Sequence, residues 1–265
     1  MPKMTSYRHG VPSWVDVSSP DLEKTAGFYC GLLGWELTPD MGPDAGGYRL
    51  FLKDGATVAG IGPLGDGPPA WSTYFHVDDV AATAARIGEL GGTLAVGPMD
   101  LPNDSGRMAF GVDPTGGFFG MHQAGGNHIG AGIVNEPGSL AWNELNVRDV
   151  DTAIKFYDAL LGSSTEPMDD SPDPYRLMKI EGRAVAGVMH MGDQFPEGVP
   201  TQWVPYFAVD DADASCQAAS DAGGGVIAAP FDTPVGKMAV LHDPTGAVFA
   251  IGAFEYIDDP NEWPA

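Results

Sequence analysis

The chain carries one pattern twice, and this internal repeat constrains the fold more than any other feature of its 265 residues. Residues 13–34 read SWVDVSSPDLEKTAGFYCGLLG, and residues 141–162 read AWNELNVRDVDTAIKFYDALLG. Three later segments recur in the same order: Tyr48-Arg49-Leu50 as Tyr175-Arg176-Leu177, Tyr74-Phe75 as Tyr206-Phe207, and Asp113-Pro114-Thr115-Gly116 as Asp243-Pro244-Thr245-Gly246. Because order and spacing are both kept, the repeat predicts two homologous domains, at residues 11–125 and 139–254, joined by a glycine-rich linker at 126–138.

Each predicted domain contains a second, fainter repeat. Residues 13–17 alternate in strand fashion. Ser19-Pro20-Asp21 then supplies a helix start, in which a cap candidate is followed by a proline and an acid in the first turn, and Gly34 closes the helix. Short strands are expected near residues 48–53 and 57–62, each bounded by glycine or proline. The pattern then restarts with a strand at 71–77, a helix at 79–90, and strands at 107–112 and 117–122. The sequence therefore predicts an α+β chain of four strand–helix–three-strand units.

This arrangement resembles the vicinal oxygen chelate superfamily, which includes glyoxalase I, bleomycin-resistance proteins and extradiol dioxygenases. The resemblance depends on four segments that recur in both halves: the first strand followed by Asp21, Phe28-Tyr29 to Leu33-Gly34, Val77-Asp78-Asp79, and Asp113-Pro114-Thr115-Gly116. The chain is most similar to two-domain glyoxalase-like proteins of actinobacteria. The resemblance implies tandem domains of four βαβββ units, whose sheets curl into two cups.

The resemblance also implies where a metal would bind, because four inner-strand positions of that superfamily carry His, Gln or Glu ligands for a divalent ion. Transferred one at a time, these positions fall on Trp14 and Trp142, Ser72 and Val204, Gly120 and Ala250, and near Gly60 and Gly187. None of these side chains is a good ligand. We therefore expect no metal and no other cofactor, and a metal-dependent glyoxalase or dioxygenase is the weakest of the functional alternatives.

Two acidic residues are candidate catalytic groups. Residues i and i+2 of a strand share a face, so Asp16 should lie beside Trp14 in the first cup, and Glu144 beside Trp142 in the second. A carboxyl group in a concave apolar site can have a raised pKa and act as a general acid or base. The alternative is structural, with each carboxylate bonded to an arginine or a backbone amide at the cup rim.

Two histidines are further catalytic candidates in the first cup only. By the same alternation His76 shares a face with Ser72, and His122 shares a face with Gly120. An imidazole with a pKa near neutral can shuttle protons. The second domain has no counterpart, and a single strand histidine is more often a hydrogen-bonded structural residue.

Apolar and aromatic strand residues could form a cup wall that stacks on a planar ligand, although half of them should instead face the helices as ordinary core. The predicted ligand-binding residues are Trp14, Trp142, Ser72, Phe110, Tyr74, Tyr206 and Met121.

The composition excludes other classes of function. A formal net charge of −23 opposes binding to nucleic acid or an anionic membrane. Only Cys30 and Cys216 occur, which excludes a disulfide scaffold, and the polar N-terminus does not resemble a secretory signal. We expect a cytoplasmic monomer or homodimer whose partner is a small molecule.

Two classes of function remain. One is a metal-independent, bleomycin-resistance-like protein that holds an apolar or aromatic metabolite in its cups, in secondary metabolism, resistance or detoxification. The other is an enzyme, namely a lyase, isomerase or cofactor-free oxygenase, that uses acid–base residues on a carbonyl or polyketide-like substrate.

Overall fold

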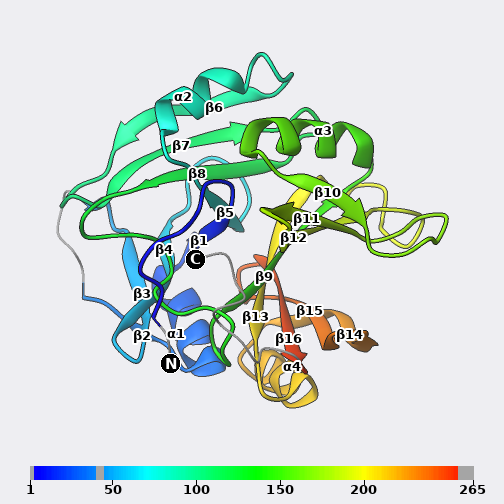
Figure 1. The fold of residues 1–265 in the computed structure, drawn as a ribbon. Coiled ribbons are helices and arrows are strands. Elements are labelled where there is room, and N and C mark those ends of the chain that lie inside the picture. Colours follow the sequence, from blue (N-terminus) through cyan, green and yellow to red (C-terminus); the bar gives the residue numbers. More distant parts are fainter. Residues whose placement is uncertain (1–2, 40–44, 256–265) are drawn as a thin grey trace.

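The computed structural model describes residues 3–39 and 45–255 and contains two eight-stranded mixed sheets, one from each half of the sequence (Figure 1). The first sheet comprises β1 (Pro12–Ser19), β2 (Glu36–Leu37), β3 (Arg49–Lys53), β4 (Ala56–Pro63), β5 (Ala70–His76), β6 (Thr93–Asp100), β7 (Gly106–Val112) and β8 (Phe118–Ala124). The second comprises β9 (Leu140–Val147), β10 (Ser164–Pro167), β11 (Arg176–Ile180), β12 (Arg183–His190), β13 (Gln202–Ala208), β14 (Gly225–Thr233), β15 (Gly236–His242) and β16 (Val248–Phe254). The predicted α+β class and the four strand–helix–three-strand units are confirmed.

The two sheets have equivalent topology. Their strand orders are β2-β3-β4-β1-β5-β8-β7-β6 and β10-β11-β12-β9-β13-β16-β15-β14. In the first sheet β1 pairs in parallel with β4 and antiparallel with β5, so the two units of that half meet along β1 and β5. The same pairing recurs between β9, β12 and β13.

Each unit has one helix, and an aspartate caps the N-terminus of each. The helices are α1 (Leu22–Leu33), α2 (Val80–Arg86), α3 (Val150–Leu161) and α4 (Ala212–Asp221). Their caps are Asp21, Asp79, Asp149 and Asp211, each of which accepts a hydrogen bond from a first-turn backbone N–H. Helix α2 ends four residues before the predicted boundary, and Gly88, a poor helix former, lies in the tight turns that follow. None of the helices in the described ranges is long and apolar enough to cross a membrane.

Most of the hydrophobic core lies in two large clusters, and each of these draws on both halves of the sequence. One packs β5, α2 and β8 against β9, α3 and β12, and the other packs β1, α1 and β4 against β13, α4 and β16. Aromatic contacts cross between the two halves: the ring centroids of Phe119 and Phe156 are 5.7 Å apart, and those of Phe28 and Phe249 are 6.0 Å apart. The two sheets therefore share their helix-side cores.

Buried polar bonds cross between the halves at matching positions. The Tyr157 hydroxyl donates to Asp113 Oδ2 at 2.8 Å and accepts from Trp203 Nε1 at 2.8 Å. In the other cluster, Tyr29 contacts Asp243 and Trp71 in the same way. The segment Asp113 to Gly116 forms the expected tight turn, and its aspartate also joins the two halves.

Candidate functional site

The strand register defines two equivalent concave faces. We use cup 1 for the inner face of the first sheet around Asp16, and cup 2 for the inner face of the second sheet around Glu144. In cup 1, Asp16 stands opposite Gly60 on β4 and opposite Ser72 on β5. In cup 2, Glu144 stands opposite Gly187 on β12. The two carboxyl groups therefore occupy matching central positions.

Asp16 lies in a hydrogen-bonded group of aromatic side chains. Its Oδ2 accepts from the Tyr74 hydroxyl at 2.7 Å and from the Tyr48 hydroxyl at 3.1 Å. Trp14 Nε1 in turn donates to the Tyr48 oxygen at 3.0 Å. Burial raises the pKa of Asp16 to about 6, against the lowering effect of hydrogen bonds from Tyr74, Tyr48 and Ser72.

Cup 2 repeats this arrangement with a longer acid. Glu144 Oε1 accepts from the Tyr206 hydroxyl at 2.9 Å, and Trp142 Nε1 donates to the Tyr175 oxygen at 2.9 Å. Burial raises the pKa of Glu144 to about 7, although hydrogen bonds from Tyr206, Tyr175 and Asn146 lower it. Each cup thus holds a buried carboxyl group that titrates near neutral pH, in contact with two tyrosine hydroxyls.

The two acids accept hydrogen bonds from tyrosine hydroxyls, and not from the arginine or backbone amide that the structural alternative expected. Tyr48 and Tyr175 were not among the site residues expected from the sequence. A signal was available: both recur at matching positions in the repeat, immediately before an arginine. Glycines face them, since a Cβ on Gly60 would lie 1.9 Å from the Tyr48 oxygen, and one on Gly187 would lie 1.6 Å from the Tyr175 oxygen.

The transferred metal positions do not fit a metal ion. In cup 1 they hold an indole, a hydroxyl and two glycines, at Trp14, Ser72, Gly60 and Gly120. A Cβ on Gly120 would lie 2.3 Å from the Tyr74 ring, so a ligating side chain has no room there. Among the described residues, no group of three or more His, Cys, Asp or Glu side chains could hold a metal ion.

An apolar wall continues from the centre of cup 1 toward the sheet edge. Phe110 lies opposite Gly120 in the register and contacts the Tyr74 ring with centroids 5.3 Å apart. Phe110 and Phe118 stack at 5.1 Å with an interplanar angle of 20°, and 42% of Phe118 is exposed. In cup 2, Met238, Val240 and Phe254 pack beside Tyr206. Each cup therefore offers an aromatic and apolar surface next to its carboxyl group.

One predicted ligand-binding residue does not face a cup. Met121 is fully buried in the shared core, because it alternates with Gly120 and His122 and so lies on the helix side of β8. The other predicted residues lie on the cup faces: Trp14, Ser72, Tyr74 and Phe110 in cup 1, and Trp142 and Tyr206 in cup 2.

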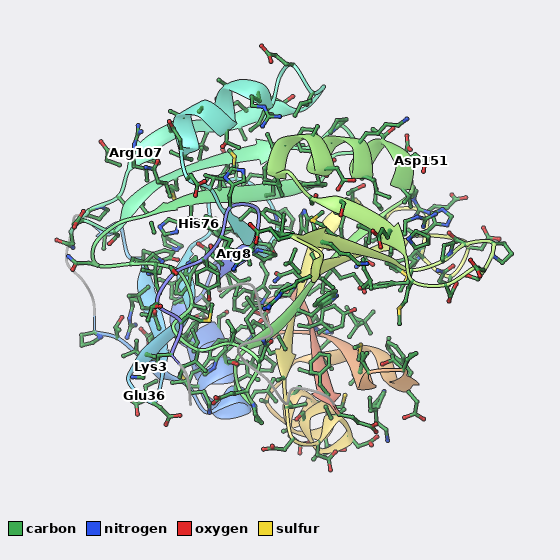
Figure 2. The ribbon with its side chains drawn as sticks, in the orientation of Figure 1. Lys3, Arg8, Glu36, His76, Arg107 and Asp151 are labelled. Carbon is green, nitrogen blue, oxygen red and sulfur yellow. The ribbon has the colours of Figure 1, made fainter. Side chains whose placement is uncertain are left out.

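The two predicted histidines lie together in cup 1. His76 and His122 are register partners on the parallel strands β5 and β8, and both are buried. Figure 2 marks His76, whose backbone also bonds to the N-terminal segment at Val11. His122 Nε2 lies 3.0 Å from the Ser105 carbonyl oxygen. His190, in contrast, pairs with Asp173.

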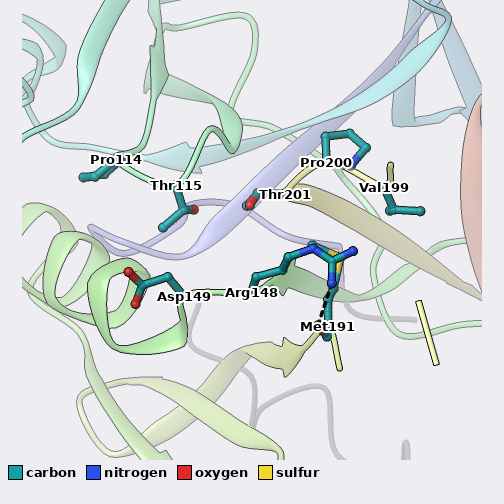
Figure 3. A pocket seen from close by; sticks show the side chains of 8 residues that line it. All are labelled: Pro114, Thr115, Arg148, Asp149, Met191, Val199, Pro200 and Thr201. Atoms are coloured by element: carbon teal, nitrogen blue, oxygen red, sulfur yellow. Dashed lines mark hydrogen bonds between the residues drawn. The ribbon is translucent and has the colours of Figure 1, made fainter. Parts of the chain in front are cut away.

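A separate cavity of about 330 Å³ lies outside the cups, where the residues at the N-terminal end of α3 meet the Asp113–Gly116 turn (Figure 3). Arg148 lines it but donates to the Met191 and Pro196 carbonyl oxygens at 3.1 and 2.9 Å. These two hydrogen bonds from the guanidinium group hold the loop after β12 in place. The eight residues that line the cavity are Pro114, Thr115, Arg148, Asp149, Met191, Val199, Pro200 and Thr201.

Comparison with known proteins places this architecture in a family. Residues 12–119 match the family model of the glyoxalase/bleomycin resistance protein/dioxygenase superfamily, and residues 143–252 match a model described as a glyoxalase-like domain. The chain belongs to this superfamily.

Its relatives span nearly the full chain. CFP32 of Mycobacterium tuberculosis, a protein whose name assigns it provisionally to the glyoxylases, is 43% identical over 95% of this chain and 97% of its own length. The anthracycline biosynthesis proteins DauV of Streptomyces sp. and DnrV of Streptomyces peucetius are each 37% identical over 94% of both chains.

Solved structures share the fold at lower identity. The Mn(II)-bound glyoxalase from Novosphingobium aromaticivorans superimposes with a TM-score of 0.66 at 16% identity, over 94% of this chain and 84% of that one. The 2,3-dioxygenase LapB from Pseudomonas sp. KL28 gives 0.64 at 17% identity, over 99% and 98%. The structural similarity therefore covers both domains of the chain.

Proposed function

We propose that this protein is a metal-independent member of the superfamily that binds a planar, largely apolar aromatic molecule in its cups. The observation that carries the proposal is the centre of each cup, where a buried carboxyl group and two tyrosines stand among positions that would otherwise bind metal. These groups offer hydrogen bonds to the polar edge of a ligand, while the aromatic wall beside them covers its faces.

Two further observations support an aromatic ligand. The stacked pair Phe110 and Phe118 leaves one ring partly exposed beside cup 1, as expected of a surface that continues onto a ligand. Two relatives are named as anthracycline biosynthesis proteins, and anthracyclines contain a planar multi-ring aromatic system.

Calorimetric titration with 2-methoxyanthraquinone tests this function. We expect saturable binding that weakens roughly tenfold in Phe110→Ala, because the variant removes aromatic contact area worth about 1 kcal/mol or more. The control is Val235→Ala, an exposed residue between β14 and β15, which should bind as the unmodified protein does. Absence of saturable binding in the unmodified protein would refute the proposal for this class of ligand.

A second candidate function is acid–base catalysis on such a ligand. The raised pKa values of Asp16 and Glu144, about 6 and about 7, favour it, since a general acid or base works best near the operating pH. Mass spectrometry of the ligand after incubation with protein separates the two functions. If Asp16 acts as the base, Asp16→Asn abolishes product formation but keeps binding, whereas a ligand recovered unchanged from the unmodified protein supports binding alone.

A further inference from the structure

Cup 1 has a histidine cluster that cup 2 lacks. His76 and His122 are neighbours across β5 and β8, and the His128 ring lies 5.0 Å from His122 and 4.5 Å from Trp14. The matching positions of cup 2 are Ala208 and Gly252. The cluster is therefore a feature of one cup only, beside the carboxyl centre that both cups share.

The hydrogen-bond partners fix which ring nitrogen of His122 holds the proton. Burial lowers the pKa of His122, which favours the neutral ring with a single N–H. Its Nε2 faces the Ser105 carbonyl oxygen at 3.0 Å, and a carbonyl oxygen can only accept. Nε2 therefore carries the hydrogen, and Nδ1 presents a lone pair as an acceptor.

The Nδ1 atom of His76 is an acceptor as well. Burial and the neighbouring His122 lower the pKa of His76, while Asp78 raises it. Asp78 Oδ1 lies 3.8 Å from Nε2, beyond hydrogen-bond distance, and its negative charge favours the hydrogen on that nitrogen. The Nδ1 atoms of both rings are buried and have no hydrogen-bond partner among the residues that the structure describes. A buried acceptor without a partner is unfavourable, so a ligand donor that reaches it when the covering side chains move aside would be bound with a net gain.

The apolar wall of cup 1 reaches this cluster. Met108 stands opposite His122, and Met99 stands opposite Met108, both partly exposed on the same face of the sheet. In cup 2 the equivalent place is occupied, because a Cβ on Gly252 would lie 2.5 Å from the Phe254 ring. In cup 1, the acceptor nitrogens of the two histidines therefore lie next to an apolar wall. In cup 2, the Phe254 ring occupies the equivalent place.

We propose that cup 1 selects a phenolic ligand, that is, a planar aromatic molecule whose hydroxyl donates a hydrogen bond to Nδ1 of His122 or His76. The proposal rests on the proposed function and adds the substrate class and the cup. A hydroxyl donor on the ligand matches the acceptors, whereas the corresponding ether has no hydrogen to donate.

Binding of 2-hydroxyanthraquinone and 2-methoxyanthraquinone, measured in parallel by calorimetry, tests the inference. We expect the unmodified protein to prefer the hydroxyl compound by about 3- to 10-fold, the range for one hydrogen bond. His122→Gln keeps an amide N–H for the Ser105 carbonyl but removes the acceptor at the Nδ1 position. The double variant His76→Gln, His122→Gln should lose the preference while it binds the ether as before.

The control is His190→Gln, which changes a histidine that pairs with Asp173 and should leave the preference intact. Binding of the ether reports whether each variant is folded. Equal binding of the two compounds by the unmodified protein would overturn the inference and leave the proposed function standing, as would a double variant that binds the ether as before and still prefers the hydroxyl compound. Failure of the unmodified protein to bind either compound would overturn both.

Discussion

At the scale of single residues, the main feature is that two buried carboxyl groups are held by neutral hydroxyl donors. A carboxylate stabilised by a nearby cation would have a low pKa, whereas Asp16 and Glu144 are desolvated and have raised ones. Hydrogen bonds from tyrosine offset only part of the desolvation. The cups therefore contain acids whose charge state changes within the physiological pH range.

This property predicts a pH-dependent stability. In the unfolded chain Asp16 ionises near its ordinary pKa of 3.8, but in the folded protein it ionises near 6. Between these values the folded state keeps a proton that the unfolded state has lost, so the free energy of unfolding falls as pH rises and levels off above about 6. The loss is about 3 kcal/mol for a shift of this size.

Asp16→Asn removes this contribution. Its free energy of unfolding, measured with denaturant from pH 4 to 8, should decline less between pH 4 and 6 than that of the unmodified protein. Glu144→Gln should show the same flattening, displaced to between about 4.5 and 7 because the pKa of Glu144 is raised from 4.5 to about 7. Parallel curves for variant and unmodified protein would contradict the raised pKa values.

Part of this site could be predicted from the sequence. Strand alternation correctly placed Asp16 beside Trp14, because two residues on one strand need only local geometry. It could not place Tyr48, which lies in the loop before β3 and reaches Asp16 from 32 positions away. Met121 was selected for its residue type, although its neighbour His122 was already assigned to the cup and adjacent strand residues face opposite sides.

At the scale of elements, glycines in β4 and β12 make room for the tyrosines. Gly60 and Gly187 stand opposite the two carboxyl groups, and a side chain at either position would overlap a tyrosine hydroxyl. From the sequence, both glycines were expected on strands, near positions that carry a metal ligand elsewhere in the superfamily. Strand periodicity contains no information about a ring that arrives from a preceding loop, so their steric role could not be inferred.

We predict that Gly60→Ala displaces Tyr48 and disrupts the centre of cup 1. The added Cβ would lie 1.9 Å from the Tyr48 oxygen and 3.1 Å from Asp16 Cβ, so the ring must move and lose its bond to the carboxyl group. We expect a loss of about 1–3 kcal/mol in the free energy of unfolding, measured with denaturant. The control Gly65→Ala, with no atom within 4 Å of the new Cβ, should change little, and equal effects of the two variants would contradict the prediction.

Edge strands show another limit of the sequence. Three strands were expected after each helix, but the sequence pattern located only two of them by residue in each unit of the first half. All eight residues of β6 are exposed, so its sequence lacks the alternation that marked the other strands. The internal repeat predicted the number of strands, but β6 was located only by its pairing with β7 in the structure.

At the scale of the whole molecule, the shared cores mean that the two halves do not have independent stability. Helix α3 of the second half packs with β8 of the first, and α1 of the first packs with β16 of the second. Separation of the halves would expose both clusters to water, at a cost that grows with the apolar area uncovered. We therefore predict that both halves unfold in one transition.

Tyr157→Phe tests this coupling, because the variant removes the donor to Asp113 and the acceptor for Trp203 from a bond that joins the halves. The unfolding midpoints of the two halves can be read separately by pulsed hydrogen exchange and mass spectrometry across a denaturant series. A loss of about 1–3 kcal/mol is expected for the buried groups left without partners, and both midpoints should shift together. The exposed control Val235→Ala should shift neither. A shift confined to peptides of one half would mean that the two sheets unfold as separate units, despite the cores that they share.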